Sequence, residues 1–369
     1  MKRLSFNYRK IGLKRIDTYI IAKFLGTYFF SIVLILSVAV VFDMTEKLDN
    51  FLNNDAPLKA IIFDYYMSFI PFYMNAFSPL FVFIAVIFFT SKMASNTEIV
   101  AILASGVSFR RIMVPYFISA TIICIISFVL GGYVIPRSNE KKLDFEDTYV
   151  KPIKKSNVRN VQMEVEKGIV MYIERYDVAT NTGCRFSLER FDDKTLVSRL
   201  TAESIKWDSA FMWTVNDYLL REFDGMRESV ARGVSMDTVI AVQPFEFFIT
   251  SQESGNMNIN ELGDYLKRQK NRGVGNIQAF LDEYYKRFST PLAAYIMTLI
   301  GVTLSSRKVR GGIGLHLGIG VALSALYILF ATFSTTFSVS GMMSPLMAVW
   351  LPNFIFLAIG IYLYRLTPK

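Results

Sequence analysis

The sequence of 369 residues contains one histidine and two cysteines, and it lacks a phosphate-binding loop. Cys124 lies in an apolar segment and Cys184 in a polar one, so the pair builds neither a disulfide framework nor a CxxC metal site. His316 lies between glycines in an apolar helix, where a packed or hydrogen-bonded histidine is expected rather than a ligand or a base. Without a Gly-x4-Gly-Lys-Ser/Thr motif, the chain cannot be its own ATPase. These absences predict a chain that is no enzyme and binds no cofactor or metal.

The composition is rich in apolar residues instead. Hydrophobic residues make up 52% of the chain and aromatic residues 15%, above the usual share in soluble domains. The apolar residues are concentrated in blocks, and many of the basic residues behind the net charge of +9 lie beside those blocks. Membrane insertion and anionic lipid explain that pattern better than nucleic acid does.

Six apolar segments predict six membrane spans. The first is too long for a signal peptide core and has no cleavage site after it, and the residues from 43 to 59 are expected to form an outer loop. Pro71 and Pro79 predict a bend in the second segment, which could line a cavity or be a kinked structural helix. The fourth is short, so its helix should begin inside the preceding stretch. The segments are residues 20–42, 60–90, 112–135, 289–304, 313–337 and 345–363.

The connector between the second and third spans reads SNTEIVAILASGVSFRR, residues 95–111. Ser95 and Glu98 have the spacing of a capping box, and Gly106 is a natural stop, which predicts a helix over residues 96–105. Glu98, Ala101 and Ser105 share one face of that helix. Small residues around one carboxylate form a docking surface for another protein, although Glu98 in a capping box alone is the simpler interpretation.

A polar region from about residue 139 to 254 shows period-two alternation bounded by turn residues. This pattern predicts an inserted antiparallel β domain, and its length suits a sandwich or a jelly roll. An open face or edge of such a domain would pass along an apolar ligand or pair with another β domain.

Helical spacing returns over residues 258–288, where Asn258 and Glu261 again resemble a capping box. We expect an amphipathic helical hairpin that turns near Gly273 and Gly275. The domains are therefore predicted as 1–138, with the coupling helix at about 95–106, then 139–257 and 258–369.

Charge predicts the orientation. Basic residues collect at the amino terminus, at Lys92, Arg110 and Arg111, and in the SSRKVRGG loop, so both termini and these loops should be cytoplasmic and the β domain outside. Four basic residues are then expected at the outer helix ends, where they would contact anionic phosphates of a substrate or merely anchor lipid headgroups. They are Lys59, Arg137, Lys286 and Arg287.

The arrangement of three spans, a β domain and three spans resembles the LptF/LptG permease family of the lipopolysaccharide export transporter. The specific stretches are the TEIVAILASGVSFRR connector, RFSTPLAAYIMTLIGVTLS and WTVNDYLLREF. The length and the amino-terminal pattern are slightly closer to LptG.

This resemblance implies an ABC transporter permease subunit of the bacterial inner membrane with a periplasmic jelly roll. It would extract lipopolysaccharide through a lateral gate formed with a paralogous permease, and pass it to periplasmic β-jelly-roll bridge components. A cytoplasmic ATPase dimer would use the ATP and hold the connector through the acidic residue, which is Glu98 here, together with Ala101, Ser105 and Gly106. Arg137 resembles a substrate-contacting arginine of the family.

Two other classes share these features. A permease for lipoproteins or another lipid, or a signalling subunit that transmits ATPase motion, would also combine spans, an external domain and a coupling helix. A secondary transporter fits less well, because beyond His316 few ionisable groups lie near the middle of a span.

Overall fold

The computed structural model describes residues 14–150, 157–193, 195–225, 227–244, 247, 253–272, 277–306 and 312–367. The chain forms two compact units, Met1–Val150 with Leu281–Lys369, and Lys151–Phe280, and each is described by itself. Several sequence predictions fall outside the described residues: the basic amino terminus, the turn at Gly273 and Gly275, and the basic loop with Arg307, Lys308 and Arg310.

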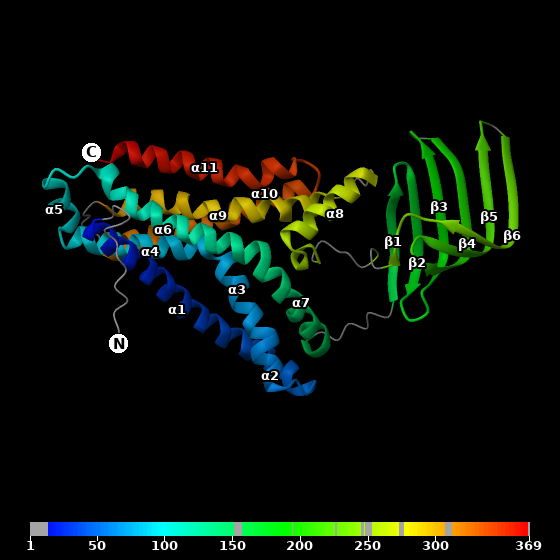
Figure 1. Ribbon diagram of the computed structural model, residues 1–369, viewed down its shortest axis with the longest axis horizontal. Coiled ribbons are helices and arrows are strands. Elements are labelled where there is room, and N and C mark those ends of the chain that lie inside the picture. The colour runs from blue at the N-terminus through cyan, green and yellow to red at the C-terminus, as the bar shows by residue number, and fades with distance from the viewer. Residues whose placement is uncertain are drawn as a thin grey trace. The chain divides into compact units, whose positions relative to one another are not determined.

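Among the described residues, six helices of the first unit are by length and composition able to cross a membrane, which agrees with the predicted number of spans. Figure 1 shows them side by side, with α5 at one end of the unit and α2 at the other. The elements are α1 (Arg15–Asn53), α2 (Leu58–Ala60), the π-helical segment η2 (Ile61–Tyr66), α3 (Met67–Ala76), α4 (Ser78–Ser95), α5 (Glu98–Ala104), α6 (Phe109–Val129), the π-helical η3 (Leu130–Val134), α7 (Ile135–Phe145), the π-helical η4 (Glu146–Val150), α9 (Gln278–Ser305), α10 (Gly312–Val339) and α11 (Pro345–Leu366).

The first helix is longer than predicted, because the expected outer loop from residue 43 is helical as far as Asn53. Lys47 and Asp43 form an i,i+4 ion pair at 3.0 Å, so the charged residues stabilise the helix rather than ending it. Phe51 is buried in a cluster with aromatic residues of η2 and α7. The ion pair and the packing of Phe51 therefore stabilise α1 as a helix beyond its apolar segment.

The second span is broken, as its prolines predict. Helix α3 ends at Ala76, Phe77 leaves helical geometry, and α4 begins at Ser78 with Pro79 in its first turn. A proline is well placed in a first helical turn, where its missing N–H leaves no hydrogen bond unmade. Pro71 lies inside α3, and a π-helical segment precedes it.

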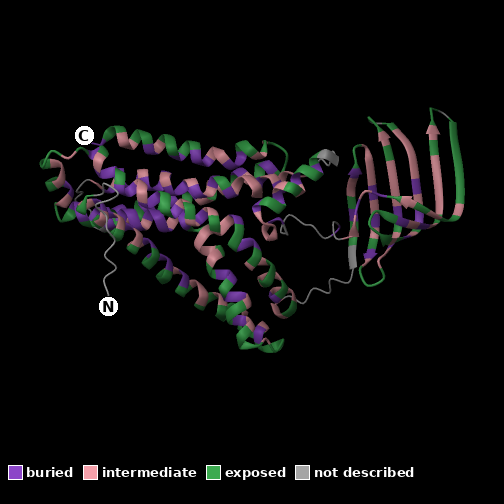
Figure 2. Ribbon diagram, viewed as in Figure 1, coloured by how far each residue is buried: buried purple, intermediate pink, exposed green. Residues whose placement is uncertain are grey.

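Helix α4 forms the centre of the helical unit. Phe81, Phe83 and Ile87 are fully buried, and most of the helix is enclosed by its neighbours (Figure 2). A helix that is apolar on all sides must be surrounded by other helices or by lipid, and α4 packs against α1 and α10. Helices α1, α10 and α11 instead expose apolar side chains along their lengths.

The packing of α10 on α4 depends on Gly320. A methyl group there would lie 2.4 Å from Ile87 Cδ1 and 2.9 Å from Phe83 Cδ1, and both side chains are fully buried. We predict that Gly320→Ala destabilises the protein by about 1–3 kcal/mol through overpacking. The thermal unfolding midpoint of the detergent-solubilised protein measures this change.

Gly318, two residues earlier on α10, provides the matched control for Gly320. A methyl group there would meet no atom within 4 Å, so Gly318→Ala should leave the midpoint unchanged or raise it slightly. Equal midpoints for the two variants would contradict the close contact of α10 with α4.

The third span continues beyond the predicted end at residue 135. Helix α6 passes without a break through η3 and α7 into η4, which ends at Val150. The polar residues from 139 to 150 are therefore helical, which corrects the predicted start of the β domain at residue 139. Pro136 lies in the first turn of α7, a position that a helix tolerates.

The second unit confirms an inserted antiparallel β domain. Neighbouring strands in the sequence pair in order from β1 to β6, and their inward side chains form one apolar core around Trp213 and Phe186. Among the described residues the strands form a single open sheet rather than the predicted sandwich or jelly roll (Figure 1). The strands are β1 (Asn157–Glu166), β2 (Ile169–Asp177), β3 (Thr182–Asp192), β4 (Thr195–Ser209), β5 (Met212–Asp224) and β6 (Arg227–Val239).

Two helices follow the sheet, as the spacing after residue 258 predicts. Helix α8 (Ile259–Arg272) begins where Glu261 accepts a hydrogen bond from the Asn258 backbone N–H at 2.8 Å, one half of the predicted capping box. Helix α9 begins at Gln278, which confirms that the fourth span starts before its apolar segment.

Candidate functional site

The predicted docking helix is α5, which joins α4 to α6. It covers Glu98–Ala104 rather than residues 96–105, because Ser95 ends α4 and donates its hydroxyl to the Lys92 carbonyl at 2.9 Å. The predicted capping box at Ser95 is therefore absent. Thr97, with φ 59°, instead turns the chain sharply before α5, and Gly106, with φ 86°, turns it again after the helix.

One face of α5 is anchored and another is exposed. Ile99 is 3% exposed and packs into the core of the helical unit, whereas Ala101, Ser105 and Gly106 are exposed. Glu98 lies half-buried beside that small surface. We call Glu98, Ala101, Ser105 and Gly106 the α5 surface. Its small side chains allow the backbone of another protein to approach closely.

The Glu98 carboxylate has two side-chain partners. It accepts hydrogen bonds from the Tyr19 hydroxyl of α1 at 3.4 Å and from Asn96 Nδ2 at 3.2 Å. Glu98 is therefore not the partner of Ser95 in a capping box, since its carboxylate is bound by two side chains and one of them lies on another helix. The contact with Tyr19 connects the α5 surface to the start of α1.

An ion pair that the sequence analysis missed lies on helices beside α5. Arg111 of α6 donates from both terminal nitrogens to the two carboxylate oxygens of Asp17 of α1, at 2.8 and 2.5 Å. The Asp17 side chain is 1% exposed and that of Arg111 33%. Such bidentate pairs fix geometry as well as charge. The sequence signal that could have predicted this pair is Asp17, a single carboxylate at the start of an apolar span. Arg111 is predicted only to mark the cytoplasmic side of the third span.

The four basic residues predicted at the other end lie on three elements. Lys59 on α2 and Arg137 on α7 are exposed, and these residues lie on neighbouring elements, because α7 packs against η2 directly after α2. Lys286 on α9 is half-buried. Arg287 contradicts the prediction of a surface position, since its side chain is 3% exposed and its Nε lies 3.8 Å from the Glu283 carboxylate.

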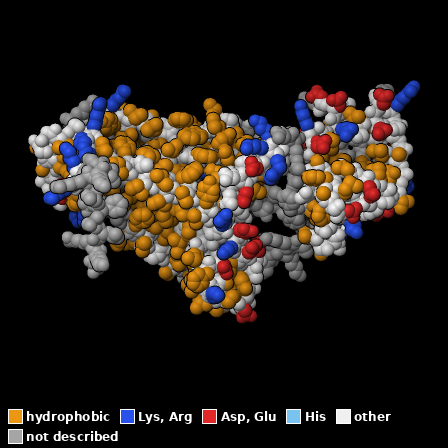
Figure 3. Space-filling view, viewed as in Figure 1, with side chains coloured by type: hydrophobic (Ala, Val, Ile, Leu, Met, Phe, Trp, Pro, Cys, Tyr) orange, Lys and Arg blue, Asp and Glu red, His pale blue; other side chains and the backbone are white. Residues whose placement is uncertain are grey.

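A second polar cluster lies at this end and was not predicted, because residues 43–59 were expected to form a loop. Lys47 of α1 lies 3.0 Å from Asp43 and 3.6 Å from Glu146 of η4, and Lys142 of α7 lies 3.7 Å from Glu146. The Tyr65 hydroxyl donates to Asp43 at 3.1 Å. The extended α1 therefore carries Lys47 at this end, where the carboxylates of Asp43 and Glu146 neutralise its charge. Figure 3 shows charged side chains of both signs at this end and apolar ones along the helices.

No catalytic arrangement was expected, and His316 behaves as predicted. It is 4% exposed, and its Nδ1 lies 3.2 Å from the Ser91 hydroxyl of α4. Cys124 and Cys184 are free thiols in different units. Among the residues that the structure describes, no three His, Cys, Asp or Glu side chains come together as a metal site.

The six helices and the inserted sheet define a polytopic membrane protein with a β domain between its third and fourth spans. A family model described as "Lipopolysaccharide export system permease LptF/LptG" matches residues 18–366, nearly the whole chain. The chain belongs to the LptF/LptG family, and at family level it is a lipopolysaccharide export permease, a transport subunit rather than an enzyme. The match covers both paralogues as one family, and no curated protein matches the sequence.

Proposed function

We propose that this chain is the permease subunit that extracts lipopolysaccharide from the bacterial inner membrane and passes it to a periplasmic bridge toward the outer membrane. The observation that carries this proposal is the α5 surface, a short helix fixed between two spans with a carboxylate beside small exposed residues. The family match supports the substrate.

The energy for transport would come from a separate cytoplasmic ATPase dimer, and this chain would bind no ATP. Glu98 would pair with a cation of the ATPase, while Ala101, Ser105 and Gly106 allow close approach. Because α5 turns directly into α4 and α6 and contacts α1 through Tyr19, a displacement of α5 would move three helices together.

The topology proposed is six spans with both termini cytoplasmic and the β domain periplasmic. The end with α5 carries Lys92, Arg110 and Arg365, all exposed and basic, whereas the opposite end mixes both signs. This difference follows the positive-inside rule. With this topology, a cytoplasmic ATPase could reach the α5 surface.

At the periplasmic end, Arg137, Lys59 and Lys286 would contact the phosphates of lipopolysaccharide. Arg137 is the strongest candidate because it is exposed and has no ion-pair partner among the described residues. Arg287 is a weaker candidate, since it is buried beside Glu283. A paralogous permease would supply the other side of the lateral gate.

The β domain would join the periplasmic bridge through an edge of its sheet. Strand β6 pairs only with β5 among the described strands, and Val230, Val234 and Val239 on it are 60%, 79% and 71% exposed. A long exposed edge strand is a template for strand addition by another β domain.

Native mass spectrometry of the tagged protein, extracted from its own membranes, tests the proposal. We expect an ATPase dimer, one paralogous permease and an adduct with the mass of lipopolysaccharide. A complex that holds the ATPase with a lipoprotein or with no lipid would overturn the substrate and keep the coupling role. Absence of any ATPase would overturn the whole proposal.

A further inference from the structure

An apolar groove runs between α6 and α11 near the end of the unit that carries α5. Its volume is about 290 Å³. Four of its residues recur at three- and four-residue spacing on one face of α6, Leu299 of α9 forms part of the wall, and α11 closes the other side. The lining residues are Arg110, Met113, Val114, Phe117, Leu299, Ile361 and Tyr364.

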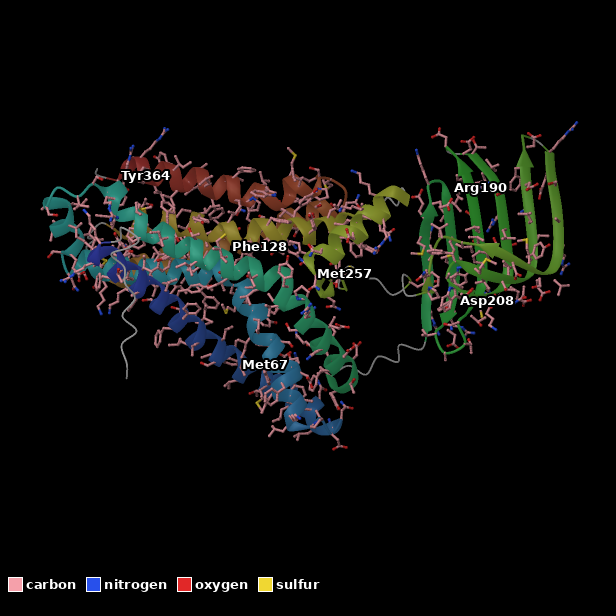
Figure 4. The ribbon with its side chains drawn as sticks, viewed as in Figure 1. Met67, Phe128, Arg190, Asp208, Met257 and Tyr364 are labelled. Atoms are coloured by element: carbon pink, nitrogen blue, oxygen red, sulfur yellow. The ribbon has the colours of Figure 1, made fainter. Side chains whose placement is uncertain are left out.

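Aromatic contacts lie at both ends of the groove. The rings of Phe109 and Tyr364 have centroids 6.1 Å apart at the end near α5, where Figure 4 labels Tyr364 on α11. At the other end the ring of Phe117 stacks on Tyr295 of α9, with centroids 6.3 Å apart. From Arg110 to Phe117 the groove follows two turns of α6, about 10 Å.

The groove is open to the surroundings and has one charge. Val114 is 43% exposed and Ile361 is 44% exposed. Arg110 is also exposed and has no carboxylate partner among the described residues, in contrast to the paired Arg111 beside it. Arg365 follows Tyr364 in the chain but does not line the groove. The groove is thus apolar along its length and basic at one end.

We propose that this groove binds an anionic phospholipid, with part of one acyl chain along α6 and the headgroup phosphate on Arg110. The apolar groove matches the acyl chain of such a lipid, and the cation at the membrane edge matches its headgroup phosphate. The site is distinct from the export substrate's proposed contacts at the opposite end.

The experiment compares two lipids of equal chain length, phosphatidylglycerol and phosphatidylcholine, bound to the purified full-length protein and scored by native mass spectrometry. One well-placed cation near a membrane surface predicts about a fivefold preference for phosphatidylglycerol. Arg110→Gln should remove that preference and leave phosphatidylcholine binding unchanged. Val114→Trp, which fills the groove with an indole at an exposed position, should reduce the binding of both lipids.

Two matched variants serve as controls. Lys92→Gln removes an exposed cation near the same end outside the groove, and Ile125→Trp adds an indole to an exposed position farther along α6. Both should leave the binding of both lipids as in the wild type. The proposal is overturned if Arg110→Gln keeps the preference, or if Val114→Trp binds as much lipid as Ile125→Trp. Neither result depends on lipopolysaccharide export, so the outcome is separable from the proposed function.

Discussion

Charge reversal at Glu98 is expected to remove the ATPase from the purified complex and to leave the six-helix unit folded. Glu98→Lys replaces a half-buried carboxylate by a cation at the first residue of α5, beside the small exposed residues of the α5 surface. If the ATPase contributes a cation there, the variant both loses the pair and sets two like charges together. Losing one partner of a buried interfacial pair costs about 2–5 kcal/mol, so the affinity should fall by about 30-fold or more.

The fold should survive because Glu98 has little to do with the core. Its hydrogen bonds go to Tyr19 and Asn96, and the adjacent Ile99 provides the buried anchor of α5. Substitutions at such positions usually change stability by no more than about 0.5 kcal/mol. Co-purification of the ATPase and the thermal unfolding midpoint, measured on the same preparation, separate docking from folding.

Two further variants sharpen this test. Ala101→Trp blocks the α5 surface without changing charge, and it should also release the ATPase. Glu140→Lys reverses an exposed carboxylate on α7, at the opposite end of the unit, and should retain it. If Glu98→Lys and Glu140→Lys retain equal amounts of ATPase, α5 is not the docking element.

The number and order of the spans could be predicted from the sequence because apolar length is a sufficient signal. An apolar run must satisfy its backbone hydrogen bonds internally and must be long enough to cross the bilayer. Pro79 likewise marks the break between α3 and α4. These properties belong to single segments and need no knowledge of their neighbours.

The ends of the helices were harder to predict, because tertiary partners decide them. Asp43 and Lys47 look like loop residues in the sequence, yet Glu146 and Tyr65, far along the chain, complete a charged cluster that keeps α1 helical. Similarly, Ser95 has capping-box spacing but remains in α4, since Thr97 adopts a left-handed conformation that local sequence patterns do not predict.

The candidate site was predicted in part. The exposed face with Glu98, Ala101 and Ser105 follows from helical spacing alone. The partners of Glu98 and the Asp17–Arg111 pair could not be predicted, because they join residues 79 and 94 positions apart. The open sheet could not be predicted for a similar reason. Alternation defines each strand and its inward side, but it does not show whether the two edge strands of the sheet pair with each other.

Breaking the pair between Asp17 and Arg111 is expected to cause a large loss of stability in the helical unit, and the two single substitutions should differ. Arg111→Ala leaves a carboxylate that is 1% exposed without its guanidinium, and removing one partner of a buried pair costs about 3–5 kcal/mol. Asp17→Ala should cost less, because the Arg111 side chain is already 33% exposed and can turn to water or lipid phosphates.

Thermal unfolding midpoints of the detergent-solubilised variants measure this asymmetry. Lys92→Ala is the control, since Lys92 is an exposed cation near the same end of the unit and outside the groove, and it should leave the midpoint unchanged. The double variant Asp17→Asn/Arg111→Leu should lose less than the sum of its single variants, because a neutral pair leaves no charge buried. Equal losses for Arg111→Ala and Lys92→Ala would show that the pair contributes nothing. A greater loss for Asp17→Ala than for Arg111→Ala would contradict the predicted asymmetry.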